Sequence, residues 1–208
     1  IPYYWVINQQ SDMNIQGLFA TKTGPQLSGL YRNRLNFGQL SVRAGVAYDT
    51  HRAEMYTNNF GHQEKSGGNH GLQGHVFISG NFSINKYWRA GANINYTSSA
   101  NYMRDYRVQG YGADTLNSNA YLEGFGTGSY NRLDGQYYEG LNQGIIHNRD
   151  LPLVLPRYTY SFTGQPDMLG GRLSVNTTDV NGKLDNGVSD QRVELPLNWN
   201  RPFHSRMG

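Results

Sequence analysis

The stretch Gln39-Leu-Ser-Val-Arg-Ala-Gly-Val-Ala-Tyr-Asp-Thr50 decides the fold class, because apolar and polar side chains alternate along it. Successive side chains of an extended strand point to opposite faces, so this alternation predicts a strand with one apolar and one polar face. The apolar set is Leu40, Val42, Ala44, Val46 and Tyr48. The opposite set is Gln39, Ser41, Arg43, Gly45, Ala47 and Asp49. A succession of such segments is the signature of a transmembrane β-barrel.

The same pattern recurs along the chain, in segments close to the ~9–11 residues of a tilted barrel strand. We expect strands at 2–9, 12–21, 26–37, 39–50, 72–84, 88–99, 115–125, 128–140, 151–163, 170–179 and 190–200. Tight links at 37–39 and 85–87 alternate with long polar links at 51–71 and 100–114. Short turns on one rim and long loops on the other are typical of outer-membrane barrels. The sequence therefore predicts an all-β protein, an antiparallel transmembrane β-barrel of which this chain supplies about ten to eleven strands.

Arginines gather on the polar faces of the predicted strands, among amides and hydroxyls. A charged side chain on the lipid face at the bilayer midplane costs about 2–4 kcal/mol, so we expect these arginines to face the lumen. They are the candidate substrate-binding residues: Arg32, Arg34, Arg43, Arg89, Arg172 and Arg192. One apolar residue, Phe77, falls among the polar residues of its segment and is the exception to the pattern.

Composition supports a two-faced sheet. Charged residues make up 16% of the 208 residues, below the ~25% of an ordinary soluble domain, while glycine (26) and tyrosine (16) are abundant. Aromatic residues cluster at strand ends, as in the girdles at the headgroup level of barrels. The net charge of +3 comes without a run of Lys or Arg, so no nucleic-acid partner is expected. There is no signal-peptide pattern at Ile1 and no finishing strand, so we expect a fragment of a longer protein.

Catalytic and metal sites find little support. The six histidines form no His-x-His or His-x-x-x-His pair, so no metal or cofactor is expected. Gly124-Phe-Gly-Thr-Gly128 lacks the strand-to-helix context of a phosphate loop and is interpreted as a turn. The acidic stretch 179–190 does not place its glycines as a calcium loop requires. Prolines near strands, Pro2 and Pro196 among them, weaken pairing and indicate an edge, a bulge or a seam that opens.

Several motifs resemble those of the lipopolysaccharide-assembly protein family LptD (OstA/Imp). They are Pro2-Tyr-Tyr-Trp5, Asp12-Met-Asn-Ile15, Thr23-Gly-Pro-Gln-Leu27, Asn101-Tyr-Met-Arg-Asp-Tyr106, Leu151-Pro-Leu-Val-Leu-Pro-Arg-Tyr158, Gly170-Gly-Arg-Leu-Ser174, Gln191-Arg-Val193 and Trp199-Asn-Arg-Pro202. The resemblance covers essentially the whole chain, and the order of the motifs is fairly specific.

The resemblance implies that residues 1–208 are part of the C-terminal barrel domain, with the N-terminal jelly-roll, the first strand and the closing strands absent. It implies a multi-pass barrel in the bacterial outer membrane that inserts lipopolysaccharide into the outer leaflet through a lateral opening, with Pro2 on the strand beside that lateral gate. The implied partners are lipopolysaccharide, an LptE-like lipoprotein plug, an LptA-like periplasmic bridge protein and outer-membrane lipid.

Other functions remain open from the residues alone. A diffusion pore needs a constricting loop and a charged eyelet, and neither is identified in the sequence. A soluble carbohydrate-binding β-sandwich would use the tryptophans and tyrosines as stacking platforms. An outer-membrane esterase would need a Ser/His pair, which no motif singles out.

Overall fold

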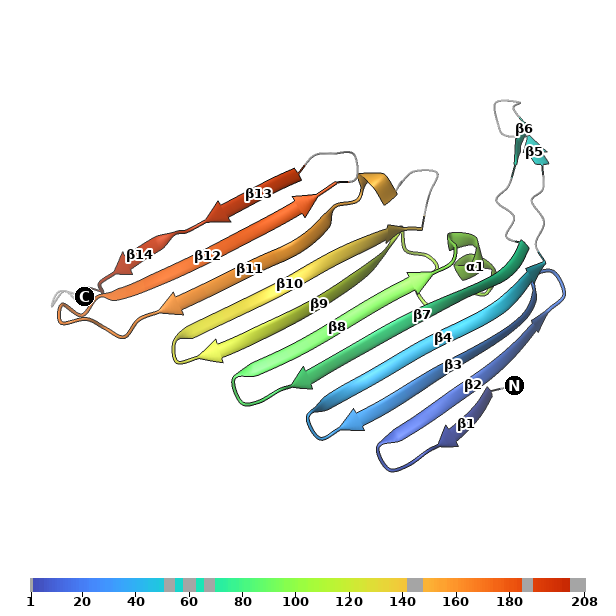
Figure 1. Cartoon of the computed structure of the whole chain (residues 1–208), viewed down its shortest axis with the longest axis horizontal. Coiled ribbons are helices and arrows are strands. Elements are labelled where there is room, and N and C mark those ends of the chain that lie inside the picture. Colours follow the sequence, from blue (N-terminus) through green and yellow to red (C-terminus); the bar gives the residue numbers. More distant parts are fainter. Residues whose placement is uncertain are drawn as a thin grey trace, which may run out of the picture.

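The computed structural model describes residues 2–50, 55–57, 63–65, 70–141, 148–184 and 189–202. Most of them form one antiparallel sheet of 12 strands in which, except at the C-terminal end, each strand pairs with the next strand of the sheet along the chain (Figure 1). Its strands are β1 (Pro2–Val6), β2 (Ser11–Ala20), β3 (Gly24–Leu35), β4 (Gly38–Thr50), β7 (His70–Ser83), β8 (Trp88–Thr97), β9 (Thr115–Gly126), β10 (Ser129–Gly140), β11 (Leu153–Thr163), β12 (Arg172–Lys183), β13 (Ser189–Glu194) and β14 (Leu197–Asn200).

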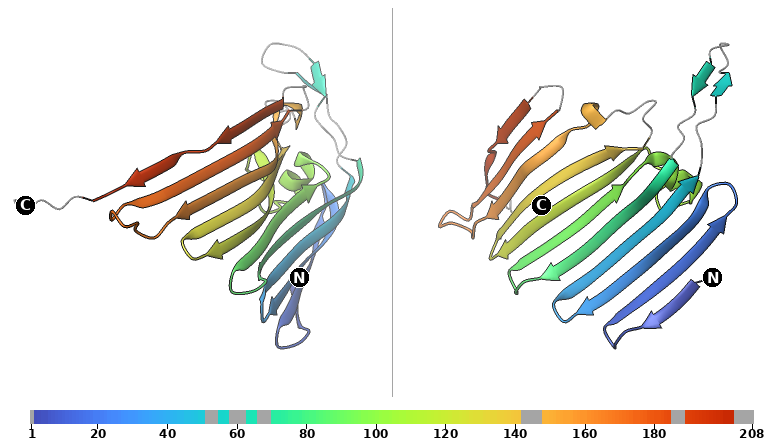
Figure 2. Two further views of the ribbon diagram at one scale, coloured as in Figure 1. Left: turned by 60° about the vertical axis from the view of Figure 1, so that its left-hand side comes forward. Right: turned by 45° about the vertical axis from the view of Figure 1, so that its right-hand side comes forward.

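The prediction of an all-β fold built from antiparallel strands is confirmed, and the observed bounds differ from the expected ones by a few residues. The sheet is strongly curved and open, as a part of a barrel wall is (Figure 2). Within the described residues no second sheet packs against its apolar face, so the sandwich architecture is not found there.

Links between strands differ in length from one rim to the other (Figure 1). The links at the lower rim of the view are all short: 7–10, 36–37, 84–87, 127–128 and 164–171. The opposite rim carries two short links, 21–23 and 184–188, together with the three longest links of the chain: 51–69, 98–114 and 141–152. Gly124–Gly128 lies at the β9–β10 turn, as expected, and Gly128 has a positive φ of 70°.

Strand register sorts the side chains onto two faces. Apolar residues lie opposite one another on one face, as Val42 and Ile78 do across β4 and β7. Large apolar side chains on this face are exposed, which is what a lipid-facing wall requires: Tyr3, Trp5, Leu27, Tyr48, Leu72, Ile94, Tyr96, Tyr137, Leu173 and Trp199. Polar residues lie opposite one another on the other face, as Ser41 and Ser79 do.

The two edges of the sheet differ. At one edge β1 pairs with β2 alone among the described strands. At the other edge β13 and β14 both pair with β12, and Leu195 and Pro196 separate them. The prediction of one strand over 190–200 is wrong in this detail, because proline contributes no N–H to the ladder.

Three links hold structure that the sequence did not predict. The link expected as a polar loop over 51–71 contains the hairpin β5 (Met55–Thr57) and β6 (Gln63–Lys65), and its last residues belong to β7. The link over 100–114 contains the helix α1 (Ala100–Asp105), and the 3₁₀ turn η1 (Asn148–Asp150) precedes β11. Among the helices that the structure describes, none is long and apolar enough to cross a membrane.

Candidate functional site

Residues 98–114, between β8 and β9, fold back onto the polar face inside the curve of the sheet (Figure 2). We call them the inward segment. Its helix α1 begins after Ser99, whose hydroxyl accepts a hydrogen bond from the Tyr102 backbone N–H at 3.1 Å. The buried core of the described residues gathers here: Tyr102, Met103, Tyr106 and Val108 from the segment, with Ala47, Leu116 and Leu141 from outside it.

This core explains the exceptional position of Phe77. Phe77 lies on the polar face of β7, packs against the buried cluster and contacts the His75 ring at a centroid distance of 4.9 Å. An apolar residue belongs on the polar face at this place because the inward segment covers it. The covering segment itself gave no strand or helix signal in the sequence analysis.

Polar contacts anchor the inward segment to β3 and β7. The Tyr102 hydroxyl accepts a hydrogen bond from Gln26 Nε2 at 2.9 Å and lies 2.9 Å from His75 Nδ1. The Tyr106 hydroxyl donates to the Thr23 carbonyl oxygen. Burial raises the pKa of both phenols, which keeps these hydroxyls protonated. Tyr102 is fully buried, so losing its partners would leave unsatisfied polar groups.

A cavity of about 400 Å³ lies between the inward segment and strands β2–β4. Arg43, on β4, donates a hydrogen bond to Oε1 of Gln109 in the inward segment. A second cavity, of about 340 Å³, lies over β4, β7 and β8 and shares Arg43 and Gln109 with the first. The polar residues lining the first cavity are Asn14, Gln16, Gln26, Ser28, Arg43, His75, Arg107 and Gln109.

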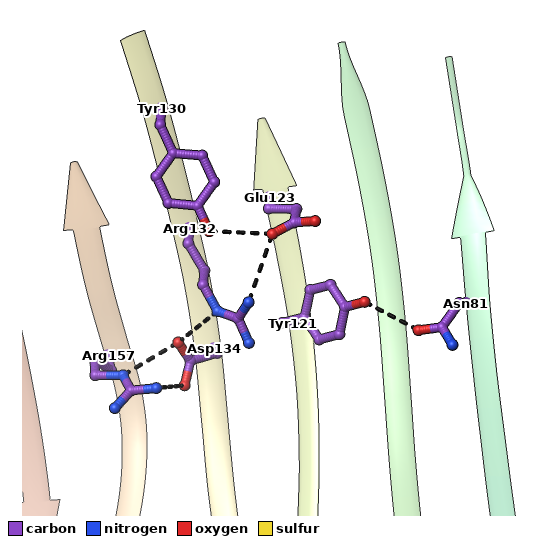
Figure 3. A network of polar contacts seen from close by, with 7 residues as sticks. All are labelled: Asn81, Tyr121, Glu123, Tyr130, Arg132, Asp134 and Arg157. Carbon is purple, nitrogen blue, oxygen red and sulfur yellow. Dashed lines mark hydrogen bonds and ion pairs between the residues drawn. The ribbon is translucent and has the colours of Figure 1, made fainter. Parts of the chain in front are cut away.

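A polar network runs across the same face from β7 to β11 (Figure 3). Asp134, only 3% exposed, holds two arginines: Arg132 Nε donates to its Oδ1 at 3.1 Å, and Arg157 Nη2 lies 2.8 Å from its Oδ2. Arg132 also lies 3.5 Å from Glu123 and stacks over the Tyr121 ring at 4.4 Å. The remaining members are Tyr130, which donates to Glu123, and Asn81, which accepts from Tyr121.

The sequence analysis missed Arg132 and Arg157. Arg132 lies two residues before Asp134 on β10, so both side chains lie on the same face of the sheet. Asp134 lies opposite Arg157 in the register of β10 and β11. The alternation along residues 128–140 is the signal that would have found Arg132, whereas no local pattern predicts the register across the link 141–152 that brings Arg157 to Asp134.

The six arginines expected in the lumen are spread over five strands, and the structure does not bring them into one cluster. Arg32 pairs with Asp12 at 2.9 Å, and Arg192 pairs with Glu194 at 2.7 Å. Arg89 stacks over the Phe125 ring at 5.0 Å. Neither Arg34 nor Arg172 forms an ion pair with any described residue. Of the six, Arg43 alone contacts the inward segment through a hydrogen bond within the described part of the chain.

The other expected site residue, Pro2, is the first described residue of the edge strand β1, where it lies opposite Gln16. No group of three His, Cys, Asp or Glu side chains is placed to hold a metal ion in the described ranges. His51, His62, His147 and His204 lie outside those ranges, as do residues 185–188 of the acidic stretch.

Comparison with known proteins identifies the family of this chain. No curated protein matches the chain. The model of the family LptD, described as LPS transport system D, matches residues 72–208, from the third residue of β7 onward. The match includes the motifs at 101–106, 151–158, 170–174, 191–193 and 199–202, whereas those between Pro2 and Leu27 lie before it. LptD is a family of lipopolysaccharide transport, not of enzymes, and this chain belongs to it.

Proposed function

We propose that this chain forms part of the wall of an outer-membrane β-barrel that inserts lipopolysaccharide into the outer leaflet. The observation that carries the proposal is a single curved sheet with an apolar face of exposed aromatic and aliphatic residues and an arginine-bearing polar face. Lipopolysaccharide likewise has an apolar and a polar part. Its acyl chains suit the apolar face, and its phosphorylated, acidic sugar headgroup suits the arginines and amides of the polar face. Moving it breaks no bond, so no catalytic residue is required.

The lateral opening in this proposal lies beside β1. Pro2 lacks an N–H, so the strand that carries it pairs less tightly with a neighbour than an all-N–H strand does. β1 pairs on one side only among the described strands, which leaves its other side for the first strand of the intact barrel, next to the gate. We propose that residues 1–208 are a piece of that larger barrel domain.

The partners in this proposal follow from membership of the family. They are lipopolysaccharide as cargo, an LptE-like lipoprotein that plugs the lumen, an LptA-like periplasmic bridge that delivers the cargo, and the lipids of the outer membrane. The polar face with its inward segment is the surface that the plug and the headgroup would share.

A general diffusion pore is the second candidate, and the inward segment favours it, since a loop folded into the lumen is what narrows a pore. Depletion of the full-length protein in its host separates the two. Loss of surface lipopolysaccharide with accumulation in the periplasm supports transport. Normal surface lipopolysaccharide with altered uptake of small solutes would overturn transport in favour of the pore.

A further inference from the structure

We propose that the cavity between the inward segment and strands β2–β4 binds an anionic sugar, meaning a sugar ring that carries a carboxylate or a phosphate. This inference rests on the proposed function, because the lipopolysaccharide headgroup is the source of such sugars. It names a subsite that combines residues of the wall with residues of the inward segment.

The charge of the cavity is the first argument. Arg43 and Arg107 both line it, and its lining contains no Asp or Glu. Four other arginines of the polar face are matched by carboxylates: Arg32 by Asp12, Arg132 and Arg157 by Asp134, and Arg192 by Glu194. Two guanidinium groups that share a cavity free of carboxylates form a site for an anion.

The neutral lining is the second argument. Four side-chain amides, those of Asn14, Gln16, Gln26 and Gln109, face the cavity together with the Ser28 hydroxyl. Each amide both donates and accepts hydrogen bonds, as ring hydroxyls of a sugar require. The volume of about 400 Å³ lies within the range of small-molecule sites, roughly 300–1,000 Å³.

The backbone at Arg107 is the third argument. Arg107 has a φ of 49°, the left-handed conformation that residues other than glycine seldom adopt. This conformation ends α1: the Arg107 N–H donates to the Arg104 carbonyl oxygen and the Val108 N–H donates to the Met103 carbonyl oxygen, as in a Schellman motif. Its two neighbours, Tyr106 and Val108, are buried, so the end of the helix fixes Arg107 at the edge of the cavity.

The site depends on the docked inward segment. Arg43 belongs to β4, whereas Arg107 and Gln109 belong to the segment, and the hydrogen bond from Arg43 to Gln109 joins the two parts. Gln109 therefore orients one guanidinium while leaving its positive charge uncompensated. Replacing this amide with a carboxylate would keep the contact and cancel the charge.

The test is calorimetric binding of deacylated core oligosaccharide to the full-length protein in detergent. Arg43→Gln and Arg107→Gln should each weaken binding about tenfold, the effect of losing one charge-assisted hydrogen bond. Arg104→Gln, an equal change of charge at an exposed position of α1, is the matched control and should bind as the wild type does. Oligosaccharide with its phosphates removed, and oligosaccharide with its carboxyl groups reduced, identify which anion binds.

Gln109→Glu separates binding from folding. If Gln109 only holds the segment in place, this variant binds as tightly as the wild type, because Arg43 gains a stronger partner. The proposal expects about tenfold weaker binding instead. Wild-type affinity in all three cavity variants, or no oligosaccharide binding by the wild type, would overturn the sugar site even where depletion confirms export. Normal export after depletion would instead overturn the proposed function.

Discussion

Gln26 of β3 and Tyr102 of α1, 76 residues apart in the sequence, are joined by a hydrogen bond of 2.9 Å in which the Gln26 amide donates to the phenolic oxygen. The bond ties a wall strand to the inward segment inside the curve of the sheet. His75 Nδ1 lies 2.9 Å from the same oxygen. Two strands therefore depend on one hydroxyl to satisfy their buried polar groups.

Tyr102→Phe should loosen the inward segment while leaving the sheet intact. Removing the hydroxyl leaves the Gln26 amide and His75 Nδ1 without this partner, at a cost of about 1–3 kcal/mol. Because this cost falls on docking of the segment, trypsin cleavage after Arg107 should become faster by at least several-fold. The control is Tyr111→Phe, since Tyr111 is 50% exposed. Equal cleavage of the two variants would show that the hydroxyl does not anchor the segment.

Asp134→Asn should be among the more destabilising charge changes on the polar face. It leaves Arg132 and Arg157 facing each other without their shared carboxylate. The expected cost is about 1–3 kcal/mol, below that of a fully buried pair, because both arginines are about one-third exposed. Urea unfolding of the full-length protein in liposomes measures it.

The matched comparison is Glu194→Gln, which breaks the exposed pair with Arg192 and should cost about 0–1 kcal/mol. If the two variants unfold at the same urea concentration, Asp134 does not organise the network.

Asp167, in the link between β11 and β12, should make the local structure of this link sensitive to acid. The Trp199 indole N–H donates to Asp167 Oδ2 at 2.9 Å, and the Gly171 backbone N–H donates to Oδ1 at 2.8 Å. These bonds favour the carboxylate and hold the pKa of Asp167 below its ordinary value. The stabilisation is complete above the ordinary carboxyl pKa and is lost as the pH falls through the lowered pKa.

An acid titration of Trp199 fluorescence, with Trp5 and Trp88 replaced by Phe, measures this transition. Its midpoint should lie below that of an unperturbed aspartate, and Asp167→Asn should abolish it. A midpoint at the ordinary value would mean that the indole does not stabilise the carboxylate.

Pro2→Ala should slow lipopolysaccharide delivery by the full-length protein without impairing its folding. Alanine restores the N–H that proline lacks, so β1 pairs more tightly and the proposed gate opens less often. The measurement is the rate at which new lipopolysaccharide reaches the cell surface. Pro166→Ala, in the link between β11 and β12, is the control. Unchanged lipopolysaccharide delivery by the Pro2→Ala variant would show that the gate does not lie beside β1.

The strands could be predicted from the sequence because each depends on its own alternation and on adjacent turn residues. Residues 39–50 show this, since the observed β4 begins one residue earlier and ends at the same residue. Pro196 was recognised as weakening a strand, yet the split into β13 and β14 also depends on how β12 pairs with each half. The local sequence pattern predicts which face of the sheet a residue lies on, whereas the pairing of strands in space determines where each strand begins and ends.

The site could be predicted only in part, for the same reason. Alternation placed Arg43 on the polar face, but its partner Gln109 comes from a link with no period of its own. No sequence pattern predicts the position of Arg107, because that position depends on the folding of the inward segment. The prediction that the arginines face the lumen stays a prediction, because the described sheet does not close.

Because β8 and β9 hold both ends of the inward segment, its docking is an intramolecular event. A short tethered chain meets its site at an effective concentration in the millimolar range. Closing a loop of about ten residues takes on the order of 10–100 ns. The tethered inward segment therefore competes with any molecule that displaces it from β3 and β7. It docks again as soon as that molecule leaves.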